Sequence, residues 1–177
     1  MTSKYYDLDD ILADGENIPC KFNITVPGLG YLSGDPEKPM QKDTKVDLPL
    51  WLAQILAVCG VLEDLDQSFV DLLPPEFISP KVINAIKSNS LEIDLHAIKS
   101  HFYKLVEKWA TMFHDTELSA VAMQMVKERA YEINNYSANA NKHLNYGFIH
   151  SLDEFERKLY KSTSESNKQM KLWINGD

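Results

Sequence analysis

The stretch DLHAIKSHFYKLVEKWATM, residues 94–112, decides the class of fold. Its large apolar residues recur at alternating spacings of three and four. That spacing is typical of a helix whose apolar seam packs inside a bundle, and Asp94 is a suitable N-cap. We therefore expect one helix here, with Phe102 and Trp109 in the core. The seam positions are Leu95, Ile98, Phe102, Leu105, Trp109 and Met112.

Helical patterns also lie on both sides of this stretch. One helix is expected to open at Pro75, another near Thr116, and a last one to run from Ser151 to Trp173. The Asn-rich residues 134–147 between the last two are typical of a loop. These patterns together predict an all-helical, bundle-like domain over residues 71–177.

The sequence before residue 70 has a different pattern, rich in Gly and Pro. Asp7 is placed to cap a short helix, and Cys20–Val26 alternates apolar and polar residues as a half-buried strand does. Leu29–Leu32 and Lys45–Leu48 are expected to form two further short strands. We therefore predict a mainly α fold, in which a small β-rich domain with short helices (residues 1–70) precedes the helical domain.

Two helical segments offer apolar faces that a partner could cover. Pro49 stands where a first helical residue would, and the run from Leu50 to Val58 is apolar on most sides. Such a helix must be buried, either in a core or between chains. The last helix is mostly polar but carries a narrow apolar stripe. The candidate interface residues are Trp51, Leu152, Phe155, Leu159 and Trp173.

The residues that carry catalytic or metal chemistry are not arranged for it. No two of the five histidines are three or four residues apart, so no helical face presents a pair of imidazoles to a metal ion. Gly28-Leu29-Gly30 is a lone pair of glycines without a nucleotide-binding context. Cys20 and Cys59 are most simply two reduced thiols, with a disulfide as the alternative. We expect no enzyme activity, no cofactor and no metal site.

The overall charge argues against nucleic acid as a direct partner. The chain carries a formal net charge of −8, and phosphate-binding domains usually present a basic face. We expect little or no DNA binding by the isolated chain, although a local basic patch is left open. No apolar run is long enough to span a membrane, and the acidic N-terminal sequence does not resemble a secretory signal.

The N-terminal segment YYDLDDILADG, residues 5–15, resembles the start of the third Psf subunits of the fungal GINS complex. The resemblance continues in order along the chain, and the loop at 134–147 is its weakest part. Other stretches that carry it are PCKF (19–22), VPGLGYL (26–32), LPLWLA (48–53), VDLLPP (70–75), KVINAIK (81–87) and DLH (94–96).

The resemblance implies a subunit without an active site. GINS proteins form a heterotetramer of four related subunits, which joins the MCM hexamer and a loading factor in the replicative helicase. The expected partners are thus three sister subunits and, through them, the helicase, with the nucleus as the location. The alternative that the sequence leaves open is a helical adaptor of another nuclear complex.

Overall fold

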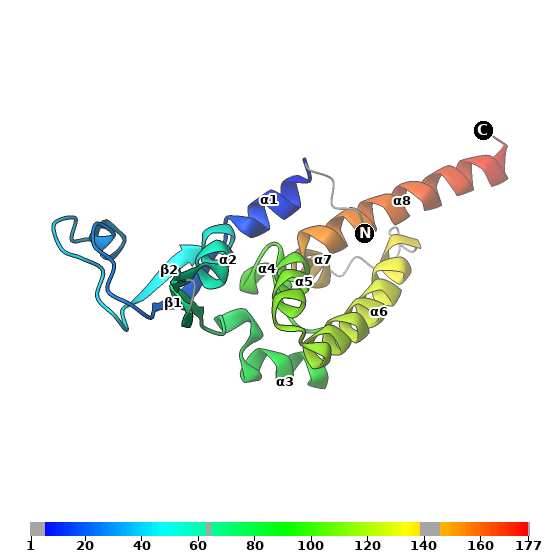
Figure 1. Ribbon diagram of the computed structural model, residues 1–177. Coiled ribbons are helices and arrows are strands. Elements are labelled where there is room, and N and C mark those ends of the chain that lie inside the picture. The colour runs from blue at the N-terminus through cyan, green and yellow to red at the C-terminus, as the bar shows by residue number, and fades with distance from the viewer. Residues whose placement is uncertain (1–5, 63–64, 139–145, 177) are drawn as a thin grey trace. The chain divides into compact units, whose positions relative to one another are not determined.

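The computed structural model describes residues 6–62, 65–138 and 146–176 (Figure 1). The chain forms two compact units, Met1–Glu76 and Phe77–Asp177. The first contains a small antiparallel sheet with short helices, and the second is built from helices. The predicted fold class, mainly α with a small N-terminal β-rich module, is therefore confirmed. None of the described helices is both long enough and apolar enough to cross a membrane.

The sheet of the first unit has β1 (Asn17–Phe22) at its centre. β2 (Lys45–Pro49) and β5 (Val70–Leu72) pair with it on either side, both antiparallel. Alternate residues of β1, namely Ile18, Cys20 and Phe22, point into the core and are buried. The predicted strand Cys20–Val26 was therefore placed too late. The chain leaves the sheet after Phe22, and Val26 makes only an isolated bridge with Met40.

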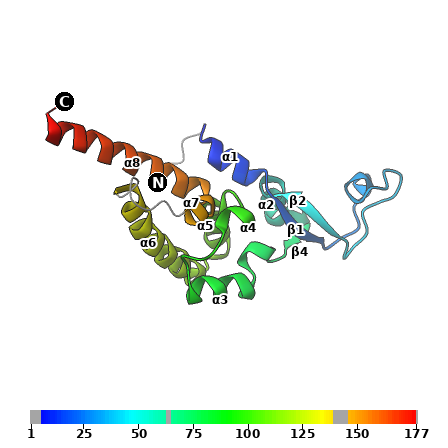
Figure 2. The ribbon, with the colours of Figure 1, turned by 180° about the vertical axis from the view of Figure 1, so that it is seen from behind.

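The connection from β1 to β2 extends away from the sheet in both views (Figures 1 and 2). It contains a 3₁₀ helix, η1 (Gly30–Ser33), where a strand over Leu29–Leu32 was predicted. The turn is closed so tightly that a Cβ on Gly30 would lie 1.9 Å from the carbonyl oxygen of Lys38. Gly34 ends it with φ 89°, a left-handed conformation that suits glycine.

Two helices accompany this sheet. α1 (Leu8–Asp14) begins as predicted at Asp7, whose side chain accepts a hydrogen bond from the Asp9 amide at 3.2 Å. α2 (Leu50–Val58) begins one residue later than expected, because Pro49 is still paired with Asn17 in the β ladder. The hairpin of β3 (Gly60–Leu62) and β4 (Leu65–Ser68) was not predicted.

The second unit begins with α3 (Pro80–Ser88), which follows a single 3₁₀ turn, η2 (Glu76–Ile78). The predicted helix start at Pro75 was wrong for a physical reason. Pro80 would then lie inside the helix, where it lacks an N–H and its ring clashes with the preceding turn. At the first position of α3 neither cost arises, because that N–H has no helical partner.

The stretch at residues 94–112 forms two helices rather than one, α4 (Leu95–Ile98) and α5 (Phe102–Phe113). The Asp94 cap is confirmed, since its carboxylate accepts from the Ala97 amide at 2.9 Å. Lys99 is extended, and the carbonyl of Ser100 accepts from the Glu154 amide at 3.1 Å. Hydrogen bonds to a distant segment thus replace helical ones at the break. Phe102 and Trp109 are buried, as predicted.

The remaining helices are α6 (Thr116–Ala138), α7 (Tyr146–His150) and α8 (Glu154–Asn175). α6 and α8 pack side by side. The predicted loop at 134–147 is partly helical at both ends, and residues 139–145 lie outside the described residues. α8 begins at Glu154 rather than Ser151, because Asp153 is its N-cap and forms a capping box with Glu156.

Candidate protein-binding surfaces

The outward face of α2 is apolar and carries no charge. None of the nine residues of α2 is ionisable, and Gln54 is its one polar side chain. Ala53 is buried in the core of the first unit, and Leu52 and Leu56 pack against that core. Trp51 and Val58, on the opposite side, are 50% and 87% exposed. This face, completed by the half-exposed Ile55, has the composition of an interface core.

α1 presents a second apolar face in the same unit. Leu8, Ile11 and Leu12 are spaced to share one side of the helix, and all three are more than half exposed. Asp9 and Asp10 lie in the first turn, near the positive end of the helix dipole. This segment was predicted as a capped helix and not as an interface, although its spacing of three and four is visible in the sequence.

The exposed face of α8 runs nearly the full length of the helix. Phe155 and Trp173 are 18 residues apart, which is about five helical turns, so they lie on the same side about 27 Å from each other. Phe155 is 43% exposed and Trp173 is 81% exposed, whereas Leu159 is half-buried. Met170, which sequence analysis did not select, falls on the same face and is also exposed. We call this the α8 stripe: Phe155, Leu159, Met170 and Trp173.

Leu152 does not belong to this surface. Its side chain is completely buried in a small core with Ile133 and Phe148. Residues 151–153 precede the helix, so Leu152 is directed by the capping turn and not by the helical repeat. The prediction that Leu152 contacts a partner is therefore corrected. The other four candidate interface residues are at least partly exposed: Trp51, Phe155, Leu159 and Trp173.

A buried ion pair fixes the start of α8. Arg129 of α6 is 0% exposed, and its guanidinium contacts both carboxylate oxygens of Glu156, at 2.7 and 3.0 Å. The same guanidinium donates to the carbonyls of Ser90 (2.9 Å) and Ile93 (3.1 Å), and it lies 5.1 Å from the ring centroid of Phe148. One side chain therefore joins α6, the segment after α3 and the start of α8.

Glu156 and Asp153 extend this arrangement to α5. Glu156 accepts a hydrogen bond from the Tyr103 hydroxyl at 2.7 Å, and burial next to this carboxylate raises the pKa of Tyr103. Asp153 accepts from the amides of Tyr103 (3.3 Å) and Glu154 (2.6 Å). Burial raises the pKa of Asp153 to about 7, assisted by the nearby Glu156 charge and opposed by the main-chain hydrogen bonds. We call Arg129, Glu156, Asp153 and Tyr103 the buried network.

Arg129 was not among the predicted site residues, although the sequence carries a signal for it. Leu118, Met125 and Ile133 are the buried seam of α6, and Arg129 stands in register between the last two. A charged residue at a seam position must find buried partners, because an unpaired charge in a core is very costly. In the described residues no buried side-chain nitrogen or oxygen lacks a hydrogen-bond partner.

The structure places no group of metal ligands together within the described part of the chain. Cys20 and Cys59 are both free thiols, as the simpler sequence interpretation held. Cys20 lies in the core, where burial raises its pKa to about 11. A thiol with so high a pKa is almost entirely protonated near neutral pH and is a poor nucleophile.

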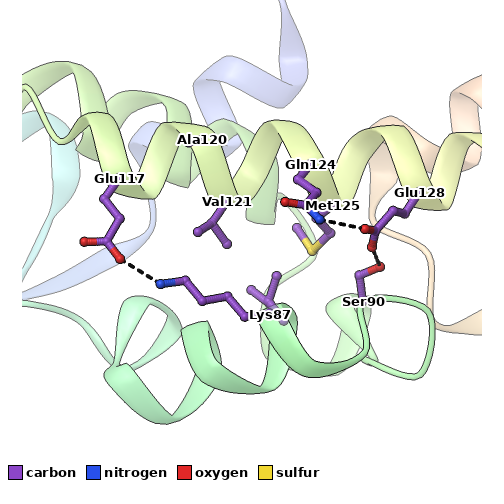
Figure 3. Close-up of a pocket in the computed structure, with 9 residues that line it drawn as sticks. Lys87, Ser90, Glu117, Ala120, Val121, Gln124, Met125 and Glu128 are labelled. Atoms are coloured by element: carbon purple, nitrogen blue, oxygen red, sulfur yellow. Dashed lines mark hydrogen bonds and ion pairs between the residues drawn. The ribbon is translucent and has the colours of Figure 1, made fainter.

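A shallow groove lies between α3 and α6 in the second unit (Figure 3). Its volume is about 310 Å³. Ile86 and Met125 line the groove and are buried. Charged side chains stand at its two ends (Figure 3). At one end Lys87 forms an ion pair with Glu117 at 2.7 Å.

A helical bundle with exposed apolar faces, preceded by a small β unit, defines a class of protein–protein interaction modules. Comparison with protein families gives the particular one. Residues 77–175 match the helical bundle domain of GINS complex proteins, and residues 6–58 match the PSF3 N-terminal domain. The chain belongs to the PSF3 family of GINS complex proteins, so the predicted resemblance is confirmed.

Curated relatives agree over nearly the whole length. The chain is 66% identical to the DNA replication complex GINS protein PSF3 of Debaryomyces hansenii, over 98% of this chain and 99% of the relative. It is 55% identical to the protein of that name from Candida albicans, over 98% of both chains. The Saccharomyces cerevisiae protein is 41% identical, over 96% of this chain and 97% of the relative.

Proposed function

We propose that this protein is a non-catalytic structural subunit of the GINS heterotetramer in the nucleus and acts in DNA replication. Family membership supports the assignment, because the relatives are named as GINS proteins of the DNA replication complex. Through the tetramer the chain would associate with the MCM hexamer and its loading factor, and so support initiation and fork progression. No cofactor has a role in this function.

The observation that carries the proposal is the exposed apolar surface of α2 and α8. Trp51 and Trp173 are half and four-fifths exposed, and large aromatic side chains of this kind are enriched among the residues that dominate binding energy. We propose Trp51, Phe155, Leu159 and Trp173 as contacts with sister subunits. Interfaces that form permanently are larger and more apolar than transient ones, and the exposed face of α2 is close to that composition.

The proposal assigns one partner-binding face to each of the two domains. We propose that a small N-terminal domain ending near residue 70 and a helical domain over the remainder each provide one of these faces. α2 is in the first domain and α8 in the second, so two sister subunits could bind at once without competing for one surface.

Co-expression with the three other GINS subunits tests the proposal. We expect a single species containing all four chains in size-exclusion chromatography, and poor solubility of this chain expressed alone, because exposed apolar faces favour aggregation. A stable, monodisperse monomer that does not co-elute with the other subunits would contradict it. That outcome would favour the alternative, a helical adaptor of another nuclear complex.

A further inference from the structure

The groove between α3 and α6 is separate from the surfaces proposed for the sister subunits. It is lined by α3, by Ser90 just after that helix, and by one side of α6 from Glu117 to Glu128 (Figure 3). None of the candidate interface residues takes part in it. A function for this groove would therefore be additional to assembly of the tetramer.

The floor of the groove is apolar. Ile86 and Met125 are buried beneath it, Val121 is half-buried, and Ala120 is exposed at its edge. A volume of about 310 Å³ is at the low end for ligand sites in proteins. This size suits one apolar side chain of a larger partner.

Glu128 provides a fixed negative charge at one end. Its carboxylate accepts a hydrogen bond from the Ser90 hydroxyl and another from the Gln124 side-chain amide at 3.0 Å. Both donors stabilise the ionised form and lower the pKa of Glu128. Ser90 is itself held in place, because it is buried and its carbonyl accepts from Arg129 at 2.9 Å.

The Glu128 carboxylate has no cationic partner among the described residues. A carboxylate has about four acceptor sites, and two neutral donors leave some of them available. At the opposite end the Glu117 carboxylate is already paired with Lys87. The groove therefore has one neutralised end and one end that is negative, oriented and open to a further donor. Phosphate groups would be repelled here, which disfavours nucleic acid.

We infer that this groove binds a short segment of another protein that carries an apolar side chain and a Lys or Arg. The apolar side chain sits over Val121 and the cation bonds to Glu128. Those two residues are seven positions apart on α6, which corresponds to about 10 Å. In a partner helix, the apolar residue and the Lys or Arg would be seven residues apart to span this distance. In an extended segment they would be about three residues apart.

A display library of short random peptides, selected on the four-subunit complex, tests this inference. We expect enrichment of peptides with a Lys or Arg at that spacing from a large apolar residue. The binding of one selected peptide is then measured by fluorescence anisotropy. Glu128→Gln should weaken it roughly fivefold, the most expected for one ion pair near the surface. Ala120→Glu, at an exposed position, should abolish binding by filling the groove.

Glu165→Gln is the matched control, because Glu165 is also exposed and also accepts from a Gln four residues away. It should leave peptide affinity unchanged. Co-elution of every variant with the sister subunits is recorded, so that a failure of assembly is seen separately. Selection of no peptide, enrichment of neutral or acidic peptides, or equal affinity for Glu128→Gln would each overturn the inference. So would peptide binding to the isolated chain but not to the complex, because a sister subunit would then occupy the groove.

Discussion

The two ends of α8 differ in what holds their side chains. At its first turn Glu156 is buried and bonded to Arg129, Tyr103 and the Asp153 amide. At its last turns Trp173 and Ile174 are mostly exposed, although both are larger and more apolar. The charged end is thus inside the fold and the apolar end outside it. In a helix arranged this way, the buried polar residues hold the helix to its own unit, and the exposed apolar residues are available to a partner.

The buried end of α8 affects the stability of the fold, whereas the exposed end can contribute binding energy when a partner covers it. A buried ion pair with all its hydrogen bonds made contributes little net stability, but removing one partner leaves an uncompensated charge. An exposed Trp contributes almost nothing to the isolated chain and a large amount once a partner covers it. Mutations at the two ends should therefore act on different measurements, folding at one and association at the other.

The largest effect is expected for Arg129→Ala. It removes the cation paired with the buried Glu156 and the donor to the main-chain carbonyls of Ser90, Ile93 and Ser151. The expected cost is about 3–5 kcal/mol. Native-state hydrogen exchange at the first turn of α8 should report this as a loss of protection. Arg157→Ala is the control, because Arg157 pairs at 2.9 Å with Glu154 near the surface. It should cost less than about 1 kcal/mol. Similar effects for the two variants would contradict a special role for the buried network.

Leu152→Ala should have the next largest effect. Leu152 is fully buried with Ile133 and Phe148, so truncation leaves a cavity and destabilises the unit by about 2–5 kcal/mol. Leu172→Ala, at an exposed position in the last turns of α8, is the matched control and should change stability by less than about 0.5 kcal/mol. If Leu152→Ala left stability unchanged but weakened subunit association, the original interface prediction for Leu152 would stand after all.

Leu152 also shows where sequence patterns stop being informative. Its spacing from Phe155 and Leu159 fits a helical stripe, but the pattern does not say at which residue the helix begins. Asp153 caps the helix, so Leu152 falls in the turn before it and its side chain enters the core. Phe155, Leu159 and Trp173 lie inside the helix, where the regular repeat decides on which side each side chain falls.

Local signals predicted the helical class and several boundaries, and long-range contacts decided the rest. The caps at Asp7 and Asp94 and the buried seam through Phe102 and Trp109 follow from short-range rules. The break before α5 does not, because the Ser100 carbonyl is satisfied by an amide more than fifty residues away. The Arg129 network depends on side chains from three segments in the same way, so its partners could not be read from α6 alone.

Trp173→Ala is expected to act on association only. Loss of a large exposed aromatic should leave protection in the helical unit unchanged, and it should weaken binding to the sister subunits by about 2 kcal/mol if Trp173 is a central contact. Co-elution at decreasing protein concentration measures this. Lys161→Ala, on a different side of α8, is the control and should bind as the wild type does. An effect of Trp173→Ala on exchange in the helical unit would mean that the two ends of α8 are not independent.

The last prediction concerns pH and the Asp153 carboxyl. Its pKa in the folded chain is raised to about 7, above the value of about 3.9 expected when unfolded. Between these values the folded state binds more protons than the unfolded state. Stability contributed by this group is therefore fully present below about pH 4 and is lost as the pH rises towards 7, by at most about 1.4 kcal/mol per pH unit.

Asp153→Asn removes this titration and keeps one acceptor oxygen, so it retains the hydrogen bond from the amide of Tyr103 or of Glu154 but not both, at every pH. The measurement is the difference in melting temperature between wild type and variant across pH 5 to 7.5, since other titrating groups cancel in that difference. We expect the wild type to lose stability relative to Asp153→Asn as the pH increases. The reverse slope would mean that the main-chain donors outweigh burial and hold Asp153 ionised. Asp153 and Glu156, at the buried end of α8, would then both be negatively charged near neutral pH. Arg129, which is bonded to Glu156, would be the cation that balances them.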